Sequence, residues 1–393
     1  MAALISLYGF WLLDPLIYSD PQGYNLWFES DAPRVLGAMT DPDSKYHARN
    51  EVHPIFSLLG YPLFSLLEAA GLSTLESGAA LMAVSAFVAA VFLYLALRGL
   101  GLPRAVGTLF TGVFLTSAAF IHWFCIIETF APGSAAICFT LFLLTTVSKN
   151  RWWLWGIASV ATLGITTTNW MAWLTAAFFR LDFRKFILIG AASALVVVAL
   201  SLAQQSIFPE SRLFFVPRSI VKEVKWTMNT YTRDWRPDRN VRAALVSSAV
   251  APAPIEGMHV QNDIASPIVD NQSSSWTAYT TPGFVAVACW LALFGTGIVG
   301  GIRDTRRRAV FFGAGAFVAG QLALHLIYGE VTFLYVAHFF PAMVLIAAFS
   351  WFSPARLLAV VAAAIFIVAG GWANLIAFEE AAQMANTLVV GRK

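Results

Sequence analysis

The sequence predicts an all-α polytopic membrane protein, and two observations support that fold class. Of the 393 residues, 58% are hydrophobic and only 12% are charged. Soluble domains are about half apolar and about a quarter charged, so the composition excludes a soluble fold. Apolar runs long enough to cross a bilayer also recur along most of the chain. The net charge of +3 is small, and we expect no nucleic-acid partner.

The first apolar run, residues 2–18, predicts a retained membrane helix. It lacks a basic n-region and a small-residue cleavage site, so it does not resemble a removed signal peptide. About twenty apolar residues cross a bilayer, which predicts roughly eleven membrane helices in this chain. Residues 170–180 are short and are either a span or a re-entrant segment. The expected helices are 2–18, 77–98, 105–122, 129–147, 152–168, 170–180, 186–205, 283–301, 309–327, 337–352 and 356–376.

Compact basic turns separate many of these helices and predict the orientation of the chain. If the spans alternate, every basic turn falls on the same side, and the positive-inside rule makes that side cytoplasmic. We therefore expect a multi-pass protein of a bacterial inner membrane, with its long, chemically varied segments facing the periplasm or exterior. The basic residues are Arg98 and Arg104; Lys149 and Arg151; Arg180, Arg184 and Lys185; Arg303, Arg306, Arg307 and Arg308; and Arg356.

Two long external segments follow from this orientation, residues 19–76 and 206–282. Within the first, residues 54–75 are apolar but interrupted by Pro and Gly. This pattern predicts a pair of interfacial helices that lie on the external membrane surface. The second is basic and aromatic in its first half, where we expect an amphipathic helix between Pro217 and Tyr231. Its second half is rich in Pro, Ser and Asn and predicts an irregular loop.

Two acidic residues at the external ends of spans are candidate catalytic groups. Asp31, in FESDAPR, follows the first span closely, so its carboxylate is placed to take a proton from a hydroxyl at the membrane surface. The alternative is that Glu29 or Asp31 caps a helix that starts at Pro33. Glu128 has no basic neighbour in sequence, and ionisable residues bordering a membrane indicate function. Its alternative is a favourable interaction with a helix dipole.

His53, with His47 and Arg49 just before it, is compatible with phosphate binding or with a divalent metal. Lone histidines are more often structural, and no metal-binding helix motif supports the metal. We name no metal ligands, and a divalent metal stays open as a cofactor. Cys125, Cys138 and Cys289 match no metal or disulfide spacing and are interpreted as small buried hydrophobes.

Three further candidates lie in external turns. Tyr335 is typical of the aromatic belt at a membrane interface, whereas His338, one turn into a span, is placed to donate to a lipid phosphate. Asn169 in the TTTNW turn falls on the same face, and its alternative is to satisfy backbone groups between two helices. The segment 212–242, which contains Arg212 and Arg218, predicts either a phosphate clamp or attraction to anionic headgroups.

The pattern resembles the GT-C superfamily of integral membrane glycosyltransferases, such as the protein O-mannosyltransferases and the lipid A aminoarabinose transferases. The resemblance depends on FESDAPR with HPIFSLLGYPLF (28–64) and on IIETFAPG (126–133). It covers about the first half of the chain and implies three regions. These are a GT-C-like transmembrane module at 1–205, a large external loop at 206–282, and variable C-terminal helices at 283–393.

The resemblance also implies the reaction and its residues. A polyprenyl-phosphate-linked sugar is the donor, and a lipid, glycan or protein hydroxyl is the acceptor. Asp31 matches the base and Glu128 the second acidic position; many members have two adjacent acids, whereas this chain has Glu29-Ser30-Asp31. The residues expected to bind the substrate or its phosphate are Arg34, His47, Arg49, His53, Asn169, Arg212, Arg218, Tyr335 and His338.

Other functions stay open at this point. A ligase or polymerase that uses a polyprenyl-diphosphate carrier would need a denser basic site within 206–242. A transporter or flippase would place its site near the bilayer midplane, in repeated halves, yet the spans carry almost no charge besides Asp14 and His325 and show no repeat. A non-catalytic assembly or scaffold protein is a further alternative.

Overall fold

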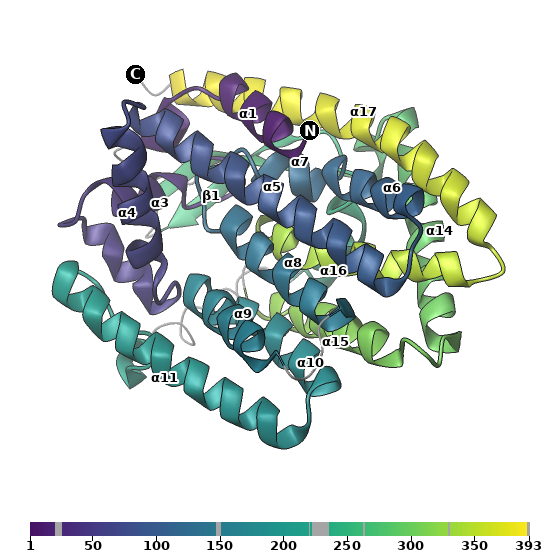
Figure 1. Cartoon of the computed structure of the whole chain (residues 1–393). Coiled ribbons are helices and arrows are strands. Elements are labelled where there is room, and N and C mark those ends of the chain that lie inside the picture. The colour runs from purple at the N-terminus through teal and green to yellow at the C-terminus, as the bar shows by residue number, and fades with distance from the viewer. Residues whose placement is uncertain are drawn as a thin grey trace.

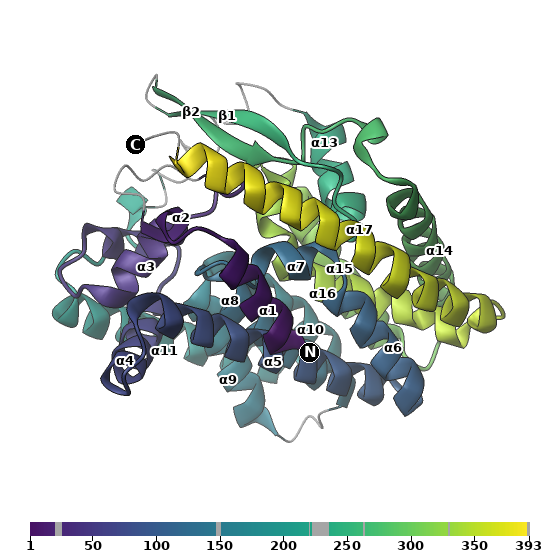
Figure 2. The same ribbon diagram turned by 90° about the horizontal axis from the view of Figure 1, so that it is seen from above.

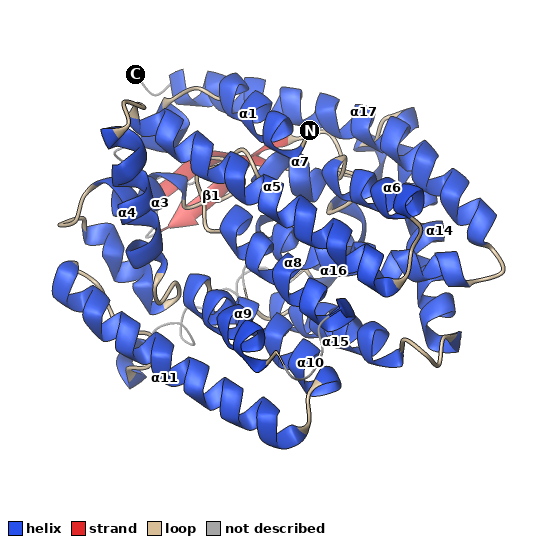
Figure 3. Cartoon of the chain, in the orientation of Figure 1, coloured by secondary structure: helices blue, strands red, loops and turns tan. Residues whose placement is uncertain are grey.

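The computed structural model describes residues 1–19, 26–146, 151–219, 221, 236–261, 264–328 and 331–390. This part of the chain is mostly helical and contains one two-stranded antiparallel sheet, as Figure 3 shows. The elements in order are α1 (Ala2–Leu12), α2 (Leu16–Ser19), α3 (Ala32–Thr40), α4 (Phe56–Ala69), α5 (Thr74–Leu100), α6 (Arg104–Leu115), α7 (Ala118–Trp123), α8 (Phe130–Thr146), α9 (Trp152–Ile165), α10 (Trp170–Arg180), α11 (Phe183–Ile207), α13 (Pro237–Arg242), β1 (Ile255–Gln261), β2 (Ile264–Asp270), α14 (Thr281–Arg303), α15 (Arg308–His325), α16 (Val336–Ala347) and α17 (Arg356–Val390).

The chain is a multi-pass membrane protein. Within the described residues, five helical segments are long and apolar enough to cross a membrane: α5, α11, α14, the segment Thr332–Phe352 around α16, and α17. Large apolar side chains point outward from them, as lipid contact requires, including Leu195 at 69% exposed and Val368 at 74%. The predicted count of eleven spans is not confirmed, because several of the other apolar helices have fewer than 18 residues.

Two of the predicted spans are interrupted by local hydrogen bonding. The run 2–18 breaks after α1, where the Asp14 carboxylate accepts the N–H of Leu16 at 2.8 Å and starts α2. Pro15 between them has no N–H to continue the first helix. The run 105–122 breaks in the same way, because the Ser117 hydroxyl accepts the N–H of Phe120 at 3.2 Å and begins α7.

Both expectations for the external segments need correction. Residues 54–75 contain one complete helix, α4, rather than a pair, and their last two residues already belong to α5; Pro62 lies inside α4, and Gly71, at φ +96°, turns the chain into α5. The second half of 206–282 contains the β1–β2 hairpin, in which Ile255 pairs with Asp270. The amphipathic helix predicted between Pro217 and Tyr231 lies almost entirely outside the described residues.

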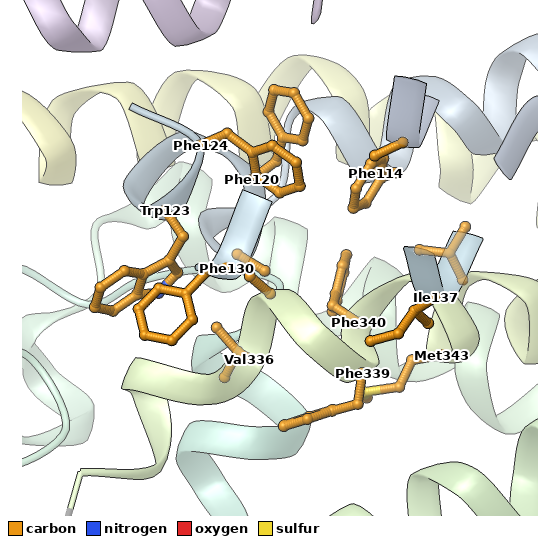
Figure 4. Packing of buried hydrophobic residues seen from close by; sticks show 14 of the residues in the cluster. Phe114, Phe120, Trp123, Phe124, Phe130, Ile137, Val336, Phe339, Phe340 and Met343 are labelled. Atoms are coloured by element: carbon orange, nitrogen blue, oxygen red, sulfur yellow. The ribbon is translucent and has the colours of Figure 1, made fainter. Parts of the chain in front are cut away.

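The core is aromatic and is centred on α16. Every residue of α16 is buried, and Figure 4 shows its side chains facing those of α7 and α8. Phe120 and Phe124 stack with ring centroids 4.3 Å apart, and Trp123 meets Phe130 edge to face at 5.2 Å. Each such pair stabilises by about 0.5–1.5 kcal/mol beyond its burial. The one polar side chain of α16, His338, is therefore enclosed by this packing.

A close backbone approach fixes α14 against the end of α16. A Cβ on Gly297 would lie 2.4 Å from the carbonyl oxygen of Ile346, and one on Gly300 would lie 2.4 Å from that of Phe349. Only glycine fits at both positions. Small residues allow this kind of contact between membrane helices.

Two of the basic turns lie at the opposite end of the bundle from α3, α4 and the β1–β2 hairpin. At one end lie α3, α4 and the hairpin; Figure 2 shows the hairpin beside the C-terminal part of α17. There Trp27 forms a parallel bridge with Val269, whose N–H donates to the carbonyl of Leu26 at 2.9 Å. The turns α5–α6 and α14–α15 lie together at the other end, visible on the right of Figure 1, because Arg307 donates to the carbonyl of Leu100.

Candidate functional site

Asp31 occupies the N-cap position of α3, with Pro33 in the first turn, as the capping alternative predicts. Its side chain nevertheless makes no capping hydrogen bond among the described residues. The carboxylate forms an ion pair with Arg34, three residues on, and its second oxygen lies 3.8 Å from Arg49 Nε. The side chain is 19% exposed, so this ion-paired carboxylate can be reached from outside.

The backbone just before Asp31 is strained. Phe28 and Glu29 have φ values of 47° and 62°, a left-handed conformation that costs non-glycine residues about 1–3 kcal/mol each. Aromatic anchoring holds it in place. Trp27 Nε1 donates to the carbonyl of His122 at 3.1 Å, and the Phe28 ring packs 5.3 Å from that of Phe333. The core thus determines where the Asp31 turn sits.

Glu128 contacts the same turn through its carboxylate. It is 3% exposed; Oε1 accepts the backbone N–H of Asp31 at 2.7 Å, and Oε2 accepts the N–H of Thr129 at 2.7 Å. Burial raises the pKa of Glu128 to about 7, although the Thr129 hydrogen bonds and the charges of Arg34 and Arg49 act against the rise. Because its oxygens bind two backbone groups, Glu128 positions Asp31.

Two guanidinium groups give the turn its positive charge. Burial, followed by the nearby charge of Arg49, lowers the pKa of Arg34 to about 10. Arg34 remains protonated at neutral pH all the same. Its side chain is 29% exposed and that of Arg49 is 33% exposed. An anion arriving from outside would therefore meet both guanidinium groups beside Asp31.

His53 joins this loop to the turn between α9 and α10. Its Nδ1 lies 2.9 Å from the carbonyl of Ile165, which can only accept, so Nδ1 is the N–H and Nε2 keeps the lone pair. Burial, followed by the charge of Arg49, lowers the pKa of His53 to about 3. The ring is neutral at physiological pH. It can accept a hydrogen bond at Nε2, but it cannot form an ion pair with a phosphate.

Asn169 and His338 meet at the first turn of α8. Asn169 is 0% exposed and His338 is 2% exposed. Both amide atoms of Asn169 and Nε2 of His338 lack a hydrogen-bond partner among the described residues. A Cβ on Gly133 would lie 2.7 Å from Asn169 Nδ2 and 3.2 Å from His338 Nε2, so all three groups converge. Buried polar atoms are rarely left unbonded, and this group is suited to a ligand's polar atoms.

Tyr335 lies close to this group. Its ring stacks on that of His325, with centroids 4.4 Å apart and an interplanar angle of 15°. Phe130, which begins α8, lies 6.4 Å from Tyr335 and 5.2 Å from His338 between ring centroids. We call the residues gathered at this end of the bundle the Asp31 cluster. Its members are Asp31, Arg34, Arg49, His53, Glu128, Asn169, Tyr335 and His338.

Three sequence-predicted residues are not part of the Asp31 cluster. His47 is fully buried; its Nδ1 lies 2.9 Å from the Ser57 hydroxyl and its Nε2 lies 2.9 Å from the carbonyl of Asp41, so the loop itself uses both nitrogens. Arg212 is 55% exposed and lies 4.0 Å from a carboxylate oxygen of Glu51. Arg218 is exposed on the surface. Within the described ranges, no three His, Cys, Asp or Glu side chains gather closely enough to hold a metal ion.

Sequence reasoning missed Thr129 and Gly133. Thr129 follows Glu128 directly and fixes one of its oxygens. Gly133 follows Pro132 in the first turn of an apolar helix, and a glycine inside a helical pattern can mark a close approach of another segment, so the sequence did contain a signal for this position.

Comparisons of the chain with protein-family models, with curated proteins and with solved structures give no match.

Proposed function

We propose that this protein is a membrane glycosyltransferase of the GT-C kind, which moves a sugar from a polyprenyl-phosphate donor to an acceptor hydroxyl at the external membrane face. The observation that supports it best is the partly exposed Asp31 carboxylate between Arg34 and Arg49 at one end of an apolar helical bundle. A carboxylate suits proton removal from a hydroxyl. Guanidinium groups suit a phosphate.

In the proposed reaction, Asp31 takes the proton of the acceptor hydroxyl. The hydroxyl oxygen forms a bond to the anomeric carbon of the sugar, and the bond from that carbon to the donor phosphate oxygen breaks. The phosphate leaves with that electron pair. Arg34 and Arg49 pair with Asp31 in the structure. A donor phosphate would draw the two guanidinium groups toward itself and leave the carboxylate oxygens free to meet the acceptor hydroxyl.

The deeper members of the Asp31 cluster have supporting roles in this proposal. Glu128 holds the Asp31 backbone, and its hydrogen bonds to Asp31 and Thr129 make it a positioning residue. Within the described residues, the neutral amide atoms of Asn169 and Nε2 of His338 lack a hydrogen-bond partner, which suits them to the oxygens of the sugar or of the leaving phosphate. Neutral groups bind hydroxyls without the cost of burying a further charge.

Two features favour this proposal over its rivals. The Asp31 cluster lies at one end of the bundle, whereas transporter sites usually lie near the midplane. Among the described residues, the cluster also contains two arginines, Arg34 and Arg49, while Arg212 and Arg218 lie outside it. Two guanidinium groups match a monophosphate donor better than a diphosphate carrier.

The test offers a panel of polyprenyl-phosphate sugars to the purified full-length chain and follows release of polyprenyl phosphate. Three proteins are compared: wild type, Asp31→Asn and Asp43→Asn. Asp43 is a matched control, because it is an exposed acid of the same loop. Thermal unfolding in detergent establishes that each variant is folded. We expect Asp31→Asn to lose at least about 100-fold in turnover, and Asp43→Asn to remain within about twofold of wild type.

Either of two results would contradict the proposal. Equal turnover by wild type and folded Asp31→Asn would remove Asp31 as the base. If wild type consumes no donor in the presence of lipid, glycan and protein acceptors, the transferase proposal fails and transport becomes the better hypothesis.

A further inference from the structure

A second feature lies at the end of the bundle opposite the Asp31 cluster. It is a hollow of about 730 Å³. One wall is the turn between α14 and α15, residues 303–307. The other is the segment that joins α16 to α17, residues 351–356. Neither wall shares a residue with the Asp31 cluster, so this hollow is independent of the proposed transfer reaction.

The back of the hollow is a fixed scaffold. Arg307 Nε donates to the carbonyl of Leu100 at 2.7 Å, and its Nη1 lies 2.6 Å from an oxygen of Asp304. The same guanidinium stands 3.8 Å above the Phe352 ring. Asp304 also accepts the backbone N–H groups of Arg306 and Arg307. The single acidic residue that lines the hollow, Asp304, is therefore already paired with Arg307.

Three other arginines line the hollow and remain available. Arg303, Arg306 and Arg356 are exposed, and none of them forms an ion pair within the described part of the chain. Four arginines and one aspartate give the lining a formal charge of +3 (four minus one). A concave surface of this charge on a rigid support favours an anion. The positive-inside rule accounts for arginines on this face in general, but not for their grouping around one hollow.

Neighbouring apolar side chains indicate what kind of anion fits. Ile302, next to Arg303, is 56% exposed, and Leu357 and Leu358, next to Arg356, are 75% and 61% exposed. They stand at the ends of α14 and α17, both long enough to cross a membrane. Trp351, in the lining, is typical of a membrane interface. An occupant with an anionic head and apolar tails matches both parts of this surface.

We propose that Arg303, Arg306 and Arg356 bind the phosphate of an anionic phospholipid, whose acyl chains lie along the exposed apolar side chains of α14 and α17. Basic pockets between membrane helices commonly hold such headgroups. Each guanidinium offers paired N–H donors to phosphate oxygens. The lipid would brace the α14–α15 turn against the start of α17.

Native mass spectrometry of the full-length chain tests this assignment. The protein is equilibrated in detergent with equal amounts of phosphatidylglycerol and phosphatidylcholine that carry identical acyl chains, and the retained lipids are counted. The pocket variant is Arg303→Gln/Arg306→Gln/Arg356→Gln. The control variant, Arg104→Gln/Arg180→Gln/Arg184→Gln, removes the same charge from other basic turns. Arg356→Gln alone serves as a milder pocket variant if the triple substitution unfolds.

We expect wild type and the control variant to retain phosphatidylglycerol in preference to phosphatidylcholine, and the pocket variant to lose that preference by at least about tenfold. Arg356→Gln alone should lose part of it. Equal losses in the pocket and control variants would show that general basicity suffices and would overturn the site. Removal of the preference by millimolar inorganic phosphate would assign the hollow to a soluble phosphate and overturn the lipid.

Discussion

The backbone N–H of Asp31 donates to Glu128 Oε1 across 2.7 Å, so the two acidic residues are joined although they lie 97 positions apart. Replacing Glu128 by Ala removes the acceptor of this partly buried N–H and of the buried N–H of Thr129. Each such loss costs about 1–3 kcal/mol. We expect Glu128→Ala to lower the free energy of unfolding by at least about 2 kcal/mol, and Glu128→Gln by less, because the amide oxygen still accepts one bond.

Thermal and denaturant unfolding in detergent measure these differences, with the exposed Glu380→Ala as a control that should change little. If Glu128→Ala and Glu380→Ala unfold alike, the hydrogen bond to Asp31 does not stabilise the fold.

The pKa of Glu128 predicts a pH dependence with a definite sign. Burial raises the pKa to about 7 in the folded protein, above its value of about 4.3 in an unfolded chain. The folded state therefore binds this proton more tightly. The resulting stability is fully present below the unfolded pKa and is lost as pH rises through about 7.

Gln at position 128 has no carboxyl group, so it does not titrate in this pH range. The melting temperature of wild type minus that of Glu128→Gln should thus increase as pH is lowered from 8 to 5. Melting curves of both proteins across this range, in one detergent and buffer series, provide the measurement. A difference that stays constant or decreases toward low pH would contradict the raised pKa.

A substitution at Gly133 is expected to impair the candidate site while the protein stays folded. A Cβ there would lie 2.7 Å from Asn169 Nδ2 and 3.2 Å from His338 Nε2, so Gly133→Ala must displace both side chains. Under the proposed function we expect at least about a tenfold loss of sugar transfer, because a displacement of about 1 Å at a reacting site can cost 10²-fold. The measurement is donor turnover by the folded variant.

Gly156 is the matched control, because a Cβ on this residue of α9 would meet nothing within 4 Å. Gly156→Ala should keep its activity and gain up to about 1 kcal/mol of stability from helix propensity. Loss of activity in both variants would attribute the effect to glycine in general rather than to the contacts of Gly133.

Asn374→Leu is expected to destabilise the fold outside the Asp31 cluster. This fully buried side chain of α17 accepts the N–H of Ala251 and donates to the carbonyls of Thr116 and Ala249, each at 2.8 Å. It thereby fastens α17 to the break between α6 and α7. Asn374→Leu removes all three bonds and should cost roughly 3 kcal/mol or more.

Unfolding in detergent measures that cost, and Thr387→Ala, an exposed position on the same helix, provides the comparison. A melting temperature of Asn374→Leu equal to that of Thr387→Ala would mean that neighbouring groups replace the lost bonds.

The sequence located most helices because an apolar run in a membrane must satisfy its backbone hydrogen bonds within the helix. It did not predict the breaks at Asp14 and Ser117, because single capping bonds decide them. The hairpin was missed for a similar reason. Gly257 and Pro267 lie inside its strands, where both residues weaken the signal of a strand.

The candidate site likewise has contacts that the sequence predicts and contacts that only the fold reveals. Asp31 and Arg34 lie three residues apart in the first turn of a helix, so their pairing is legible in the sequence. The partners of Glu128, Asn169 and His338 come from distant segments that only the folded core brings together. No local pattern specifies such contacts.

The bridge between Trp27 and Val269 has a consequence for the order in which the protein is made. The loop that holds Asp31 emerges near the beginning of synthesis, whereas its neighbouring strand, β2, emerges only after α5 and α11, two of the five candidate spans. Until then, Leu26 has no partner for its carbonyl from that strand. Contacts between such distant positions form late. The Asp31 loop is therefore synthesised early but reaches its final conformation only after β2 has emerged.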